Sequence, residues 1–325
     1  MLELIESREA IAFVGTGLSS PLYPTWLTLL RKLAEKAETV TGAPFHAPTG
    51  ISEMDALDYA EALQEHFRKH DASLNQYYSI IGREFSGIAE RCTDRQRNLV
   101  RLPFKGFVTT NYDEALEEAM LDCGVKRANC GIVIKRDEDH HTISEFLLSL
   151  DDSRQIKRVA HLHGSWDETK HMILSRSDYD RAYGSAHSAA DSGSVTRPDQ
   201  WPLHRRLVWA LLATRRMVFL GTSLDDPYLK ALLRAVATDL WNWDQSIHYA
   251  VLPLDNESVR RQQNDEAEFI RHGVRIVYFD NLDGTYRSLD QLINEALARC
   301  GKQNVSAWLE SVNAETERTL RPHED

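Results

Sequence analysis

The stretch of sequence that decides the fold is residues 10–19, AIAFVGTGLS. Five apolar residues lead directly into the turn Gly15-Thr16-Gly17. A short apolar run that ends in glycines predicts a strand buried on both faces of a parallel sheet. Residues 25–40 then place apolar side chains at helical spacing, and Thr25 can cap that helix. The chain therefore opens with a strand, a glycine turn, a loop and a helix.

Further short apolar segments predict six more strands. They lie at residues 106–109, about 131–134, 158–162, 217–220, 247–252 and 274–279. Helical patterns lie between most of them, at residues 113–122, 203–215, 226–240 and 257–272. Strands that alternate with helices predict an α/β fold, here a Rossmann-like parallel sheet with helices on both faces.

The segment of about residues 41–103 begins with a loop rich in Gly and Pro and continues with helical patterns only. It predicts a helical insertion between the first two strands. Residues of about 184–200 are small and polar, which predicts a flexible loop. We expect one domain over residues 1–300, followed by a polar C-terminal tail over residues 301–325.

Charge and cysteine content exclude several classes of protein. The chain has 325 residues, and its 38 Lys and Arg against 49 Asp and Glu give a formal net charge of −11, which argues against direct nucleic-acid binding. No signal peptide and no run of about 18 apolar residues is present, so we expect a cytoplasmic protein without a membrane segment. None of the four cysteines forms a CxxC pair, and we expect no zinc site.

The glycine turn alone is ambiguous. Glycines after a strand allow a pyrophosphate to approach the backbone, and N–H groups at the start of a helix can face the anion. The full G-x-G-x-x-G pattern needs a glycine at position 20, where this chain has Ser20, and no acidic residue ends a second strand. This excludes an ordinary hydride-transfer dehydrogenase and leaves a purely structural turn as an alternative.

Three more polar motifs follow predicted strands. They are Thr109-Thr110-Asn111-Tyr112-Asp113, His161-Leu162-His163-Gly164 and Gly221-Thr222-Ser223. The carboxyl ends of parallel strands meet at one edge of a sheet, where ligands bind in such folds. We therefore expect all four motifs to surround one site.

In this combination and order, the motifs resemble those of the sirtuin superfamily, which has a GAG-x-S turn, a T-x-N-x-D segment, an HG dipeptide and a GTS turn. The matching pieces here are GTGLS (15–19), TTNYD (109–113), HG (163–164) and GTS (221–223), within residues of about 8–280. The resemblance implies an NAD⁺ site with Asn111 and His163 at the reacting ribose. The cofactor-binding residues that it implies are Gly15, Thr16, Gly17, Ser19, Thr110, Asp113, Gly221, Thr222 and Ser223.

Two departures from the sirtuin pattern indicate which branch of the superfamily the chain resembles. No cysteine lies between His163 and Gly221, where sirtuin deacylases carry a four-cysteine zinc module. Residues 21–26, PLYPTW, replace the sirtuin G-I-P-D-F-R stretch. In both respects the chain is similar to the prokaryotic SIR2-like NADases of anti-phage defence, a branch that includes the Thoeris effector and the SIR2 partner of HerA-type ATPases.

The residue types suit the cleavage of nicotinamide from NAD⁺. The leaving group already carries positive charge, so the reaction passes through an oxocarbenium-like ribose without a general acid. An amide such as that of Asn111 can position groups without titrating, and an imidazole such as that of His163 can take a proton. The alternatives are a helix cap for Asn111 and a structural role for His163. We interpret His161 as a supporting residue rather than one of a metal-binding pair.

The sequence therefore predicts an NAD⁺ glycohydrolase with NAD⁺ as its substrate. Because uncontrolled NAD⁺ hydrolysis is toxic, we expect gating by homo-oligomerisation or by a partner such as a HerA-type ATPase or another defence-system component. Two alternatives stay open. One is an NAD-dependent protein deacylase or ADP-ribosyltransferase, and the other is a non-catalytic module that senses NAD⁺ or ADP-ribose.

Overall fold

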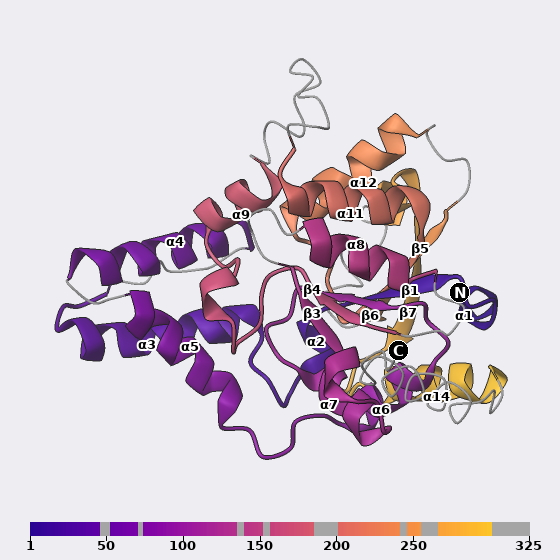
Figure 1. The fold of residues 1–325 in the computed structure, drawn as a ribbon, viewed down its shortest axis with the longest axis horizontal. Helices are drawn as coiled ribbons and strands as arrows, with labels where there is room; N and C mark the ends of the chain where they lie inside the picture. Colours follow the sequence, from indigo (N-terminus) through magenta and orange to yellow (C-terminus); the bar gives the residue numbers. More distant parts are fainter. Residues whose placement is uncertain are drawn as a thin grey trace, which may run out of the picture.

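The computed structural model describes residues 1–45, 53–70, 74–134, 140–151, 157–184, 201–240, 246–254 and 266–300. A seven-stranded, entirely parallel sheet forms its centre, in the order β3-β4-β2-β1-β5-β6-β7 (Figure 1). The predicted α/β fold is confirmed, and all seven predicted strands are present. Their bounds are β1 Ala10–Val14, β2 Phe107–Thr109, β3 Gly131–Val133, β4 Val159–His161, β5 Arg216–Leu220, β6 His248–Leu254 and β7 Val274–Asp280.

The order of the strands reverses around β1. The chain places β2 on one side of β1 and returns to place β5 on the other side. In the register of the sheet, Val14 lies level with Thr109 of β2 and with Leu220 of β5. Thr109 in turn lies level with His161 of β4. The ends of β1, β2, β4 and β5 are therefore aligned around a topological switch point, which is where open α/β sheets bind ligands.

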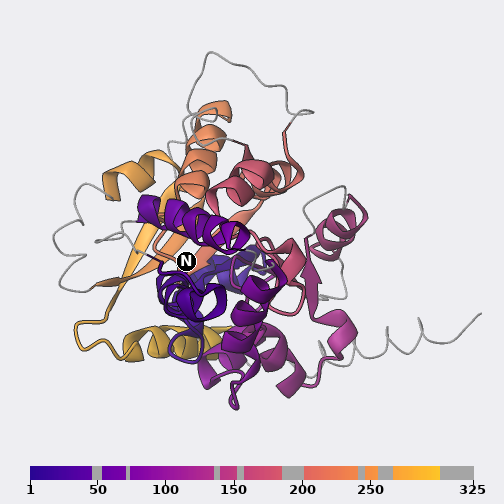
Figure 2. The ribbon, with the colours of Figure 1, turned by 90° about the vertical axis from the view of Figure 1, so that its left-hand side faces the viewer.

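Alternating residues of β1 separate two hydrophobic layers. Ala10, Ala12 and Val14 belong to one buried cluster, and Ile11 and Phe13 belong to the other. The first layer is covered by α1 (Leu2–Glu6), α3 (Trp26–Thr41), α6 (Asp94–Arg101), α7 (Ala115–Asp122) and α14 (Arg287–Arg299). The second layer is covered by α8 (His140–Ser149), α9 (Arg176–Tyr183), α11 (Leu203–Thr214) and α12 (Pro227–Asp239). In Figure 2 the orange α12 lies above the sheet and the yellow α14 lies below it.

The predicted helical insertion contains α4 (Glu53–Lys69), α5 (Leu74–Ser86) and α6. Helices α4 and α5 pack on α3 and form a lobe at one end of the sheet (Figure 1). Thr25 caps α3, as predicted, because its hydroxyl accepts a hydrogen bond from the Thr28 N–H. Of the predicted helix at 257–272, residues 266–271 are helical within the described part of the chain. Residues 185–200 of the predicted loop and the tail at 301–325 lie outside the described residues.

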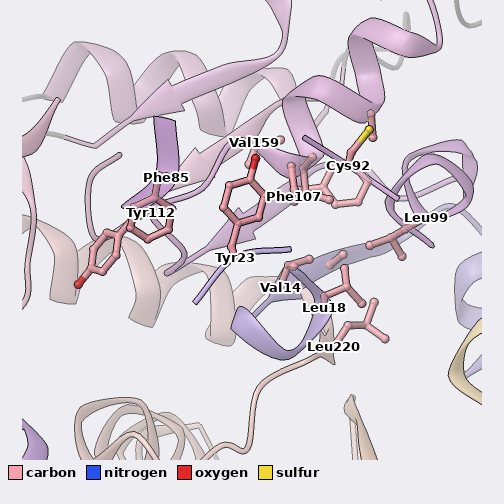
Figure 3. Close-up of a cluster of buried hydrophobic side chains, with 14 of the residues drawn as sticks. Val14, Leu18, Tyr23, Phe85, Cys92, Leu99, Phe107, Tyr112, Val159 and Leu220 are labelled. Atoms are coloured by element: carbon pink, nitrogen blue, oxygen red, sulfur yellow. The ribbon is translucent and has the colours of Figure 1, made fainter. Parts of the chain in front are cut away.

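The turns that follow β1 and β5 interlock through their backbones. Gly15 N–H donates to Leu220 O (2.9 Å), and Gly17 N–H donates to Gly221 O (2.8 Å). A Cβ on Gly15 would lie 2.5 Å from Gly221 O, and a Cβ on Gly221 would lie 2.4 Å from Leu18 N, so no larger residue fits at either position. Beneath the turns, Leu18 of α2 (Thr16–Ser19) packs against Val14 and Leu220 (Figure 3).

Because of this interlock, replacing Gly221 by alanine should cost more stability than replacing Gly42, although both glycines have the same backbone conformation. Gly221 has φ +68°, and Gly42, the C-cap of α3, has φ +70° but no atom within 4 Å of an added Cβ. Gly42→Ala should lower the free energy of unfolding by about 1 kcal/mol, the cost of a left-handed alanine. Gly221→Ala should lower it by about 2 kcal/mol more, because its Cβ also overlaps the first turn. Denaturant titration of both variants measures the difference, and equal losses would contradict the interlock.

Candidate active site

A cavity of about 520 Å³ lies along the carboxyl ends of the strands, a volume typical of a cofactor or substrate site. It runs across the switch point at β1. Nine of the eleven predicted site residues line it, from all four motifs: Gly15, Thr16, Gly17, Thr110, Asp113, His163, Gly221, Thr222 and Ser223. The structure thus brings the four motifs together at one edge of the sheet, as the strand order requires.

The two ends of the cavity differ in polarity. At one end His163, Tyr179 and Asp226 supply ring nitrogens, a phenol and a carboxylate. The other end is largely apolar and aromatic, and it is lined by Val251, Leu252 and Pro253 of β6, Tyr278 and Phe279 of β7, and Tyr286. The glycine interlock forms the middle of the cavity. The N–H groups of Gly17 and Leu18 are bonded to Gly221 O and Gly15 O, so these two glycine-turn groups already have partners within the protein.

Asn111 and Ser19 lie beneath the wall of the cavity and do not line it. Their exposed fractions are 2% and 3%, whereas Thr110 and Tyr112 on either side of Asn111 reach the cavity. The Asn111 Nδ2 donates to Ser19 Oγ (3.2 Å), and the Asn111 Oδ1 is buried with no hydrogen-bond partner. An unsatisfied buried amide oxygen is costly, which indicates a group held ready for another donor.

Asp113 performs the capping role that the sequence left open for Asn111. Its Oδ1 accepts from Ala115 N–H (3.0 Å) at the start of α7 and from Ser19 Oγ (3.0 Å). Burial raises the pKa of Asp113 to about 6, and these two hydrogen bonds offset the rise only in part. Through its hydrogen bond with Ser19, the Asp113 carboxylate thus links the motif at 15–19 to the motif at 109–113 beside the cavity.

His163 is buried between two tyrosines of α9. Its Nε2 lies 2.9 Å from the Tyr183 hydroxyl, and its Nδ1 lies 3.4 Å from the Tyr179 hydroxyl. Burial, with a smaller contribution from His204, lowers the pKa of His163 to about 3. The imidazole is therefore neutral at physiological pH and a weak base, so it can accept a proton only with a compensating negative charge nearby.

Asp226 extends this chain of polar contacts. Its Oδ1 caps α12 by accepting from the N–H groups of Tyr228 (2.8 Å) and Leu229 (3.0 Å), as expected for an acidic residue at a helix start. Its Oδ2 accepts from the Tyr179 hydroxyl (3.3 Å), and burial raises the pKa of Asp226. The sequence analysis missed Tyr179 and Tyr183. The sequence does carry a signal for them. Ser175 and Asp178 form a capping box that starts α9, and Tyr179 and Tyr183, four residues apart, then lie on the same face of that helix.

In the described part of the chain, the side chains form no metal-binding cluster and the helices include no membrane span. There, no group of three or more His, Cys, Asp or Glu side chains is arranged to hold a metal ion. His161 and His163 have separate partners, because the ring of His161 contacts Glu117 and the Asn111 carbonyl. Among the described helices, none has both the length and the apolar character needed to cross a bilayer.

Comparison with known proteins identifies the family. A family model described as a SIR2-like domain matches residues 105–273, just over half of the chain. The chain belongs to the SIR2-like domain family. This confirms the resemblance that the four motifs indicated.

Curated relatives align over most of this chain at modest identity. The protein is 24% identical to a Bacillus cereus protein named NAD(+) hydrolase ThsA over 82% of this chain and 47% of the relative. Proteins of the same name from Enterococcus faecium and Acinetobacter baumannii are 24% and 23% identical, over 77% and 89% of this chain and 44% and 54% of those relatives. The chain thus spans about half the length of these curated relatives.

The buried carboxylate of Asp113 should make stability depend on pH. Because the pKa of Asp113 is raised to about 6 from 3.8, stability is lost as pH rises through this range. Asp113→Asn removes the buried charge and should stabilise the fold by about 3 kcal/mol at pH 8 and by less than about 1 kcal/mol at pH 4.

Asp280→Asn is the matched control. Asp280 is exposed, and its carboxylate likewise accepts a hydrogen bond from the N–H two residues later, that of Leu282 (3.0 Å). The control should show no gain that grows with pH. Denaturant titrations of both variants across pH 4–8 test this, and parallel pH profiles for the two would contradict a raised pKa at Asp113.

Proposed function

We propose that this protein is an NAD⁺ glycohydrolase that releases nicotinamide and ADP-ribose. The observation that carries the proposal is the neutral, buried His163 with its Tyr179–Asp226 chain at one end of a long cavity whose middle is the glycine interlock. The similar proteins named NAD(+) hydrolase support the same chemistry.

The polarity of the cavity suggests one orientation for NAD⁺. The adenine suits the apolar and aromatic end at β6 and β7, where it can stack and lose its contact with water. The pyrophosphate then crosses the glycine turns at Gly15, Gly17 and Gly221, which allow close approach to the backbone because glycine has no side chain. This orientation leaves the nicotinamide ribose at His163 and above Asn111.

The reaction needs one bond cleavage and one proton acceptor. The bond between C1′ and the nicotinamide nitrogen breaks, and its electron pair neutralises the pyridinium, so no acid is required at the leaving group. Water adds to C1′ of the resulting oxocarbenium ion and loses a proton. The proposed acceptor of this proton is the neutral imidazole of His163, which lines the cavity and can take it directly or through a ribose hydroxyl.

The hydrogen-bonded chain behind His163 suits that role. If Nδ1–H donates to the Tyr179 oxygen, the Tyr179 hydroxyl can donate to Asp226 Oδ2 and the Tyr183 hydroxyl can donate to Nε2. When Nε2 gains a proton, the Tyr183 hydroxyl turns to accept a hydrogen bond from it, and the Asp226 carboxylate stabilises the new positive charge through Tyr179. Such a chain orients a base in the way that the third member of a catalytic triad does.

We also propose that the activity serves anti-phage defence by depleting NAD⁺ in the cytoplasm, as in abortive infection. An NADase that is always active would exhaust its own cell, so the proposal includes a gate. Homo-oligomerisation or a separate partner, such as a HerA-type ATPase, is the form of gate proposed. The similarity to the prokaryotic SIR2-like branch supports this role.

The test of function is nicotinamide release from NAD⁺ by the purified chain, alone and with the products of neighbouring genes. His163→Ala and Asn111→Ala should each lower the rate by about 10² to 10⁴, the range for loss of a proton acceptor or of a positioned group. His70→Ala is the control, because His70 is an exposed histidine outside the cavity, and it should keep the wild-type rate.

Three results would contradict the proposal. Absence of nicotinamide under every condition would exclude turnover, and tight NAD⁺ binding in that case would favour the sensor alternative. Release that requires an acylated peptide would favour the deacylase. An unchanged rate in His163→Ala would remove the proposed proton acceptor.

A further inference from the structure

A second buried histidine lies outside the cavity and has an acidic partner. His161 ends β4 and is 2% exposed, and Glu117 of α7 is 4% exposed. The His161 Nε2 lies 2.5 Å from Glu117 Oε1. Its other nitrogen, Nδ1, lies 3.1 Å from the backbone oxygen of Asn111. Both ring nitrogens of His161 therefore have hydrogen-bond partners.

The chemistry of these partners fixes the proton on Nδ1. A carbonyl oxygen only accepts, so Nδ1 must carry a hydrogen and donate it to Asn111. The carboxylate of Glu117 likewise only accepts, so Nε2 must donate as well, and the ring is an imidazolium. Burial lowers the pKa of His161, but the charge and hydrogen bond of Glu117 outweigh it and raise the pKa to about 9.

The contact on the Asn111 backbone is one link in a closed ring of polar contacts. The Asn111 side chain donates to Ser19, Ser19 donates to Asp113, and Asp113 accepts from the N–H of Ala115 on α7. Glu117 lies on the same helix, and through His161 the ring returns to the Asn111 carbonyl. Asn111 is thus held at both its backbone and its side chain.

As a purely structural contact, the buried Glu117–His161 ion pair would be energetically costly. Glu117 Oε2 is buried without a hydrogen-bond partner, and a buried ion pair is often no more stable than apolar residues of the same volume. The neighbouring strand also makes room for it, because a Cβ on Gly131 would lie 2.7 Å from Glu117 Oε1. These costs indicate a role other than stability.

We propose that Glu117 and His161 are positioning residues for Asn111, holding its peptide and its amide in place beneath the part of the cavity wall where the reacting ribose would lie. This inference rests on the proposed NAD⁺ hydrolysis. His161 acts on the substrate only through Asn111, and Glu117 acts only through His161. Charged groups that face the His161 ring are Glu117 on α7 and Asp113 and Glu114 just before α7.

Two amide substitutions of His161 separate its two contacts. In His161→Asn the side-chain nitrogen occupies the place of Nδ1 and can still donate to the Asn111 carbonyl. In His161→Gln it occupies the place of Nε2 and can still reach Glu117. Each variant loses one buried contact, but His161→Asn also leaves the buried Glu117 carboxylate without a donor and should therefore lose more stability than His161→Gln. His161→Gln should lower kcat by about 10- to 100-fold with KM nearly unchanged, whereas His161→Asn should stay within about threefold of wild type.

The pH profile tests the part played by Glu117. In the wild type, deprotonation near pH 9 leaves the remaining proton on Nε2, facing the carboxylate, and breaks the bond to Asn111. The turnover rate should therefore fall above about pH 9. In Glu117→Gln the amide can donate to Nε2, which keeps the hydrogen on Nδ1, and this alkaline loss should disappear. Glu118→Gln changes the next residue of α7, whose salt bridges with Arg91 and Arg127 lie at the surface, and should keep the wild-type profile.

Crystal structures of the two His161 variants give a readout that does not need turnover. The Asn111 carbonyl should stay in place in His161→Asn and should move in His161→Gln. Equal kcat values in the two variants, or an Asn111 peptide at the same place in both, would overturn the positioning role. If the wild type releases no nicotinamide at all, the proposed function fails, and the two crystal structures still decide whether His161 holds Asn111.

Discussion

The structure depends on a backbone contact between two glycine turns. The turns after β1 and β5 meet with Gly17 N–H bonded to Gly221 O and with no space for a Cβ on Gly15 or Gly221. This contact joins neighbouring strands at the point where the order of the sheet reverses. It also leaves bare backbone in the middle of the cavity, so packing and ligand access have the same cause. The glycines thus have a structural role that does not exclude a binding role.

Two buried histidines at the end of β4, on the β2 side of this centre, are kept in opposite charge states by their partners. Among the described residues, the hydrogen-bond partners of the His163 ring are the neutral tyrosines of α9, and burial keeps the ring neutral. His161, two residues earlier, faces a carboxylate and is kept protonated. In the proposed mechanism the neutral ring accepts a proton and the charged ring holds Asn111. The same residue type therefore serves two roles because one partner differs.

The sequence predicted what depends on local pattern. Buried parallel strands are apolar runs that end in polar or glycine motifs, so the seven strands and the meeting of four motifs at one edge could be deduced. The roles of Tyr179, Tyr183 and Glu117 could not, because a helical pattern gives the face on which a side chain lies but not the partner that it meets in the fold. The inward position of Asn111 was also hidden, since it depends on Ser19, which lies 92 residues earlier in the chain. Side-chain direction follows from packing, and a motif does not encode it.

The central claim is that the cavity holds NAD⁺ with its nicotinamide ribose at His163. A crystal structure of the His163→Ala variant with NAD⁺ tests it most directly, because intact substrate should persist in that variant. The account predicts adenine against Val251 and Tyr278, the pyrophosphate over Gly15 and Gly221, and the nicotinamide ribose beside Asn111. NAD⁺ bound in the reverse orientation, or outside this cavity, would contradict it.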